Sequence, residues 1–93
     1  MEIIWLKPAQ RGLESIMDYI AQESLVSARK YGSEVYARVN GLLKFPESGQ
    51  IYSVQSGKII RKIIIGKTKT VFYRVGRQKI FILSIQDNRQ DWK

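Results

Sequence analysis

The sequence contains no cysteine and no histidine. Without cysteine there can be no disulfide and no thiolate metal ligand. Without histidine the chain lacks the commonest metal ligand and the usual acid or base near neutral pH. Serine–histidine nucleophile pairs and zinc-hydrolase sites are therefore excluded. Any catalysis would depend on lysine, arginine, tyrosine or carboxylate side chains, and we expect neither a metal nor another cofactor.

Long apolar runs are also missing. No segment approaches the roughly 20 apolar residues that a membrane-spanning helix needs. Residues Met1–Lys7 lack the basic-then-apolar order of a signal peptide. A chain of 93 residues with 44% hydrophobic residues is suited to one domain with one core. We therefore expect a single cytoplasmic domain over residues 1–93, with no membrane partner.

Acidic residues are scarce and unevenly placed. The chain has 16 lysine and arginine residues against 8 aspartate and glutamate residues, for a net charge of +8. Residues 1–45 contribute +1 of this charge and residues 46–93 contribute +7. Between Lys58 and Lys79 there are eight basic residues and no acidic one. Such a segment attracts nucleic acid or an acidic protein, so we expect the C-terminal half to meet the target.

The first half of the chain predicts one strand and two helices. Glu2–Leu6 is a short β-branched and aromatic run, typical of a strand. Pro8 suits the first turn of a helix, and Leu13–Ala21 has apolar residues at helical spacing. Ser24 is a candidate N-cap for a second amphipathic helix, which Pro46 ends. The two helices are expected to form a hairpin.

The second half predicts strands. Glu47–Gln50 has loop composition, and the runs Ile59–Ile65, Thr70–Val75 and Lys79–Gln86 are typical of strands. The connections between these runs are short and contain glycine, as hairpins need. The predicted fold class is α+β with the order β-α-α-β-β-β. The helical hairpin packs on one face of a small, mostly antiparallel sheet.

Side-chain alternation predicts which face of the sheet carries charge. The face that meets the helices should contain Val71, Tyr73, Val75, Phe81, Leu83 and Ile85. Arg74 would then lie on the opposite, open face. Arg61 and Lys62 point to opposite faces of their strand, and alternation does not decide which of them is open.

Four motifs together resemble the RelE/ParE toxin superfamily. They are Leu13–Ala21 in the first helix, Leu42–Gly49 at the end of the second, Thr70–Val75 in the sheet and Ile82–Asp91 at the C-terminus. They cover nearly the whole chain in the family's order. The resemblance implies the toxin of a type II toxin–antitoxin module. A cognate antitoxin would be its partner, in a toxin–antitoxin hetero-oligomer.

The superfamily divides by mechanism, and the residues favour one branch. RelE-like members cut messenger RNA at the ribosome, whereas ParE-like members poison DNA gyrase. RelE-like toxins commonly have a basic residue where this chain has Thr70, and they tend to have a late tyrosine. No tyrosine follows Tyr73, and Trp92 cannot act as an acid or base. The resemblance therefore favours a ParE-like gyrase inhibitor.

The predicted target-binding residues are Arg61, Lys62, Arg74, Arg77, Asn88, Arg89 and Trp92. One alternative is a ribosome-dependent, metal-independent endoribonuclease acting on messenger RNA through Arg61, Lys62, Arg74 and Arg89. A second alternative is a non-toxic basic binding module. The sequence favours a non-enzymatic role but leaves these alternatives open.

Overall fold

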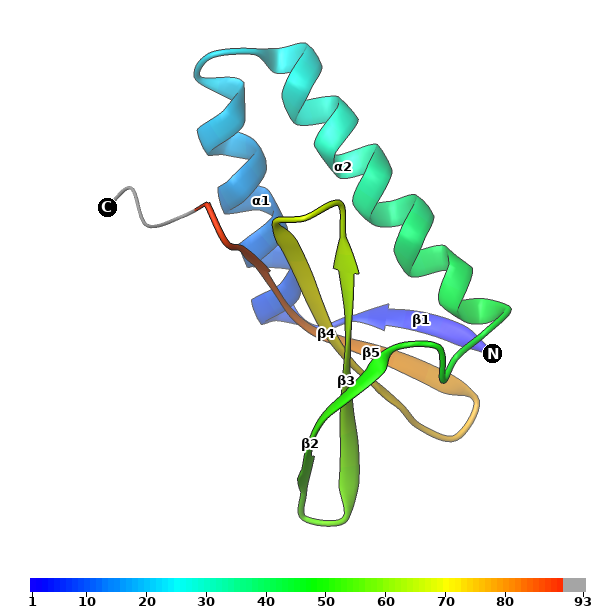
Figure 1. Ribbon diagram of the computed structural model, residues 1–93. Coiled ribbons are helices and arrows are strands. Elements are labelled where there is room, and N and C mark those ends of the chain that lie inside the picture. Colours follow the sequence, from blue (N-terminus) through cyan, green and yellow to red (C-terminus); the bar gives the residue numbers. More distant parts are fainter. Residues whose placement is uncertain (90–93) are drawn as a thin grey trace.

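The computed structural model describes residues 1–89 as one strand, a helical hairpin and four further strands (Figure 1). The elements are β1 (Glu2–Trp5), α1 (Lys7–Ala21), α2 (Leu25–Asn40), a 3₁₀ turn (Gly41–Leu43), β2 (Gln50–Gln55), β3 (Lys58–Ile65), β4 (Lys69–Val75) and β5 (Lys79–Asp87). Within this part of the chain, no helix has the length and apolar character needed to cross a membrane.

The strands form one mixed sheet in the order β1-β5-β4-β3-β2. β1 pairs with β5 in parallel, and the other neighbours are antiparallel. The helical hairpin packs against one face of the sheet, and the β2–β3 hairpin extends away from the helices (Figure 1). The α+β fold class is confirmed. The sheet has one strand more than expected, because β2 occupies Gln50–Gln55 and no strand was predicted between the loop Glu47–Gln50 and Ile59.

Local signals in the sequence account for the helix ends. Pro8 lies in the first turn of α1, where its missing N–H has no helical partner to lose. The Ser24 hydroxyl accepts a hydrogen bond of 3.1 Å from the Ser27 N–H and caps α2. Gly32 of α2 lies against the Met17 side chain of α1, where a Cβ would come within 2.8 Å of the Met17 methyl group. This glycine lets the two helices approach closely.

The hairpin between β2 and β3 turns on two residues with positive φ. Ser56 has φ 53° and Gly57 has φ 76°, which are the angles of the tight turn that best fits the twist of paired strands. The pairing of β2 with β3 shifts between Ile51 and Ser53, so Tyr52 is an extra residue in the edge strand. Its side chain therefore departs from simple alternation.

A second register shift corrects the predicted faces of β5. Phe72 pairs with Ser84 while Tyr73 pairs with Ile82, so Leu83 is an extra residue on β5. Such a bulge inverts the side-chain phase of the strand. Ile80 and Ile82 are consequently fully buried against the helices, and the prediction that Phe81 and Leu83 face the helices is wrong.

After Leu83, the side chains of β5 point to the faces that were predicted for them. Ile85 is buried as expected, and Asp87 faces the helices with it. On β4, Val71 and Tyr73 are buried in the core, in agreement with the prediction for that strand.

Within residues 1–89, Tyr73 is the largest fully buried side chain, and its hydroxyl connects a loop to the sheet. It accepts a hydrogen bond of 2.8 Å from the Gly49 N–H and donates one of 2.8 Å to the Pro46 carbonyl. A Cβ at Gly49 would come within 2.6 Å of the same hydroxyl, so only glycine fits there. Tyr73 thereby holds the chain between the helices and β2 in place.

We predict that Tyr73→Phe destabilises the fold by about 2 kcal/mol, because the buried Gly49 N–H and the partly buried Pro46 carbonyl both lose their hydrogen-bond partner. Urea denaturation measures the change in the free energy of unfolding. The control is Tyr36→Phe, since Tyr36 is 48% exposed and its hydroxyl can bond to water. Equal stability of Tyr73→Phe and wild type would contradict this role.

Candidate target-binding surface

The predicted target-binding residues divide between the two faces of the sheet. Lys62 pairs with Phe72 and Arg74 pairs with Phe81, on the face that the helices leave open. Arg61 pairs with the core residue Tyr73, on the face that the helices cover. Adjacent positions on β3 therefore have different surroundings, and only Lys62 belongs to the open face.

Arg61 is bound to the loop before β2. Its Nη1 atom donates hydrogen bonds to the Glu47 carbonyl at 3.1 Å and the Gly49 carbonyl at 2.9 Å. These bonds complement those of the Tyr73 hydroxyl to the same loop. Arg61 therefore helps to hold this loop in place. If Arg61 also bound a target, the same guanidinium would have to serve both purposes.

On the open face, basic side chains lie over aromatic rings. The Lys62 Nζ atom is 5.6 Å from the centre of the Tyr52 ring. The Arg74 guanidinium carbon is 4.5 Å from the centre of the Phe81 ring. Both distances are within the range of cation–π attraction. The rings position the two positive charges on the sheet surface, and the exposed Arg77 follows in the turn after β4.

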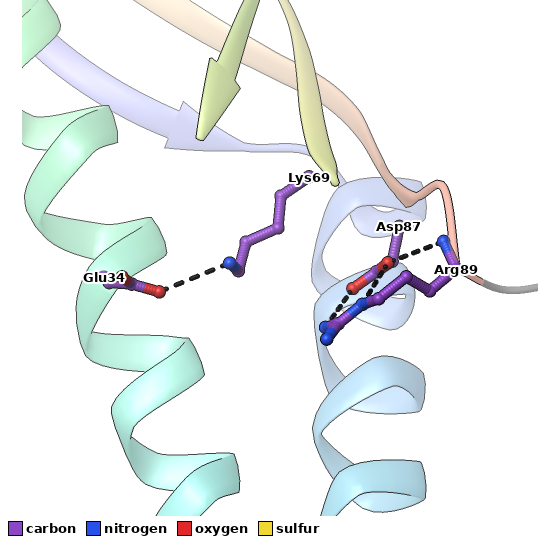
Figure 2. Close-up of polar contacts among 4 residues, drawn as sticks. All are labelled: Glu34, Lys69, Asp87 and Arg89. Carbon is purple, nitrogen blue, oxygen red and sulfur yellow. Dashed lines mark hydrogen bonds and ion pairs between the residues drawn. The ribbon is translucent and has the colours of Figure 1, made fainter. Parts of the chain in front are cut away.

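The end of β5 carries a charged pair on the helical side of the sheet (Figure 2). Arg89 donates from Nε to Asp87 Oδ1 at 3.1 Å and from Nη2 to Asp87 Oδ2 at 3.0 Å. The Arg89 backbone N–H also donates to Oδ1, at 2.9 Å. The Asp87 side chain is 3% exposed, whereas that of Arg89 is 61% exposed. The arginine thus covers a carboxylate that burial would otherwise disfavour.

Burial alone would raise the pKa of the Asp87 carboxyl. The hydrogen bonds and positive charge of Arg89 outweigh burial, so the pKa of Asp87 lies below its ordinary value. The same hydrogen bonds, followed by the charge of Asp87, raise the pKa of Arg89. The ion pair is therefore kept across the physiological pH range.

A second ion pair connects α2 with β4 nearby (Figure 2). The Lys69 Nζ atom is 3.3 Å from Glu34 Oε1 and 4.9 Å from the centre of the Tyr31 ring. Burial, and then the charge of the Asp87 carboxylate, raise the pKa of the Tyr31 phenol. The Tyr31 hydroxyl has no hydrogen-bond partner within residues 1–89. We call these five residues the charged cluster: Tyr31, Glu34, Lys69, Asp87 and Arg89.

The four residues of the nuclease alternative do not converge. Lys62 and Arg74 lie on the open face, while Arg61 and Arg89 bind protein groups on the helical side. Asn88 is exposed, and its backbone N–H donates to the Thr68 carbonyl at 2.6 Å. Trp92 lies outside the described residues. The open face thus offers Lys62 and Arg74, with Arg77 at its margin, as the charges available to a partner.

Sequence reasoning missed Tyr52 and every member of the charged cluster except Arg89, which was predicted to bind the target. Tyr52 was overlooked because β2 was not predicted, although the Ser56-Gly57 pair that follows is a hairpin signal. Lys69 was assigned to a turn, and its ion pair joins residues far apart in the chain. No local pattern in the sequence marks such a long-range contact.

Comparisons with known proteins agree with this fold. Residues 3–92 match the family described as "ParE toxin of type II toxin-antitoxin system, parDE". A solved structure titled "Chromosomal ParDE TA system from P. aeruginosa" contains a chain with a TM-score of 0.77 and 22% sequence identity. The similarity covers 94% of this chain and 95% of that chain, and at this identity it supports the fold. No curated protein sequence matches.

We predict that Arg89→Gln lowers the free energy of unfolding at pH 7 by about 1–2 kcal/mol, because a buried carboxylate loses its charged donor. A carboxyl whose pKa is lowered by folding stabilises the folded state at pH values above its pKa in the unfolded chain, which is near 3.9 for aspartate. This stabilisation is lost as the pH falls through the lower pKa of the folded state. The difference in the free energy of unfolding between wild type and Arg89→Gln should therefore become smaller as the pH is lowered.

Denaturation at pH 7 and near pH 3 measures this narrowing. Arg29→Gln is the matched control, since Arg29 is an exposed arginine of α2. A wild-type advantage that stays constant between the two pH values would contradict the role of the Asp87 pair.

Proposed function

Because this chain belongs to the ParE family of toxins from type II toxin–antitoxin systems, we propose that it acts in the cytoplasm by inhibiting DNA gyrase. A cognate antitoxin is the partner that neutralises it. The observation that supports inhibition by binding is the separation of the basic residues. Two of the four nuclease candidates are engaged with protein groups on the helical side.

The open face supplies what a docking surface needs. Lys62 and Arg74 are held over aromatic rings, and Arg77 is exposed at the adjoining turn. Charges held in fixed positions steer association with a negatively charged partner and set its orientation. We propose that gyrase, which works on DNA, meets this face, and that Lys62, Arg74 and Arg77 are the main contacts.

Exposed apolar side chains offer a separate surface for the antitoxin. Ile51, Val54 and Ile59 are 58%, 64% and 41% exposed on the β2–β3 hairpin. β2 is also an edge strand, with backbone groups open to pairing. We propose that an extended acidic and apolar segment of the antitoxin covers this hairpin and forms a hetero-oligomer with the toxin.

We predict that the purified protein inhibits gyrase supercoiling of plasmid DNA and that Arg74→Glu/Arg77→Glu raises the concentration for half-inhibition about tenfold or more. Reversing charges in the docking surface replaces attraction with repulsion. Arg29→Glu/Arg38→Glu makes the same charge change on the exposed side of α2 and should have little effect.

Unimpaired supercoiling at micromolar wild-type protein would refute the proposal. Translating ribosomes provide a second arm of the experiment. Cleavage of messenger RNA on adding the protein would assign it to the ribonuclease alternative instead.

A further inference from the structure

We propose that the open face of the sheet binds a single-stranded segment of DNA. The site is the aromatic array, defined as Tyr52, Lys62, Phe72, Arg74 and Phe81. The choice of DNA over RNA rests on the proposed function, because gyrase would present DNA to this face. The binding of a single strand rests on the array itself.

The array consists of two groups of rings and cations on β2 to β5: Tyr52, Phe72 and Lys62 form one, and Arg74 and Phe81 form the other. The Tyr52 and Phe72 rings meet edge to face, with centroids 4.8 Å apart. Lys62 lies over Tyr52, and Arg74 lies over Phe81. Gly76 makes room for the last pair, since a Cβ there would come within 2.8 Å of the Phe81 ring. Rings interleaved with cations are the pattern that binds bases and phosphates of single strands.

The rings are accessible from solvent. Tyr52 is 56% exposed, and Phe72 and Phe81 are partly exposed on the face without helices. A shallow hollow beside Tyr52 and Phe72 is lined by Ile60 and Leu83. Polar Gln55 and Ser84 border the same hollow and can hydrogen-bond to base edges. The hollow thus combines apolar walls for stacking with polar groups at its rim.

The charge of this face fits a polyanion. Within residues 50–89 the only acidic side chain is Asp87, which lies on the helical side and is paired with Arg89. Glu2 lies in register with Lys79 at the β1 edge of the sheet. An acidic protein segment would satisfy the charges but would leave the exposed rings without stacking partners. Nucleic acid satisfies both features.

The strand must be single because the rings need free base faces. In a duplex each base is stacked on its neighbours, and only the edges are open to protein. Unpaired bases can leave the stack and lie on aromatic side chains, as in sequence-tolerant single-strand binders. Tyr52 on β2, Phe72 on β4 and Phe81 on β5 supply rings for such a platform.

Fluorescence anisotropy with labelled oligothymidine tests the proposal on the full chain. Tyr52→Leu should weaken binding roughly tenfold, which is the effect of losing one stacked base. Lys62→Gln should lower the slope of log Kd against log salt by about 0.7, the value for one phosphate contact on a single strand. Both side chains lie outside the core cluster, and thermal unfolding checks that the variants fold.

The controls make the same changes on the helical side. Tyr36→Leu removes a ring that is 48% exposed and packs on Trp5 at 5.1 Å. Lys30→Gln removes an exposed charge from α2. Neither should change oligothymidine binding. An equal loss in a control and its matched variant would overturn the assignment of the array.

Three competitors decide the ligand class. Oligothymidine should displace the label better than oligouridine, a DNA duplex or polyglutamate. No binding of oligothymidine, or tighter binding of any of these competitors, would overturn the proposal. Inhibition of supercoiling without oligothymidine binding rejects the single-strand site and leaves the proposed function intact. Oligothymidine binding without inhibition rejects gyrase as the target and retains the site.

Discussion

The arrangement of this protein depends on the bulge at Leu83, which reverses the side-chain phase within β5. Before the bulge, Ile80 and Ile82 point to the helices and close the core. After the bulge, Ile85 and Asp87 are the residues of β5 that point to the helices. Without the extra residue, either the first pair or the second would face solvent. The bulge thus allows one strand to fill the core at one end and to place a buried carboxylate at the other.

The basic residues of the two faces have different tasks, because alternation on β3 and β4 directs Arg61 to the helical side and Lys62 and Arg74 to the open side. On the helical side, Arg89 covers Asp87, and Arg61 binds the loop that Tyr73 also holds. On the open side, Phe81 lies under Arg74, because the bulge turns this ring away from the core. Positive charge therefore stabilises the fold on one face and remains available for binding on the other.

The fold could be predicted further from the sequence than the site. Pro8, Ser24 and apolar periodicity defined the helices, since these signals act within one or two turns. Arg74 on the open face followed from alternation on β4, which is regular. β2 and the outer face of β5 were missed, because bulges at Tyr52 and Leu83 break the period of two. The partners of Arg61 and Lys69 depend on tertiary contacts that no local pattern contains.

The central claim is that the open face carries the function and the helical face carries the structure. Hydrogen–deuterium exchange of the protein, free and bound to gyrase with DNA, tests this claim most directly. Our account predicts new protection along β3, β4 and the turn at Arg77, with the outer side of α2 unchanged. Protection confined to α1 and α2, with the open face unaffected, would contradict it.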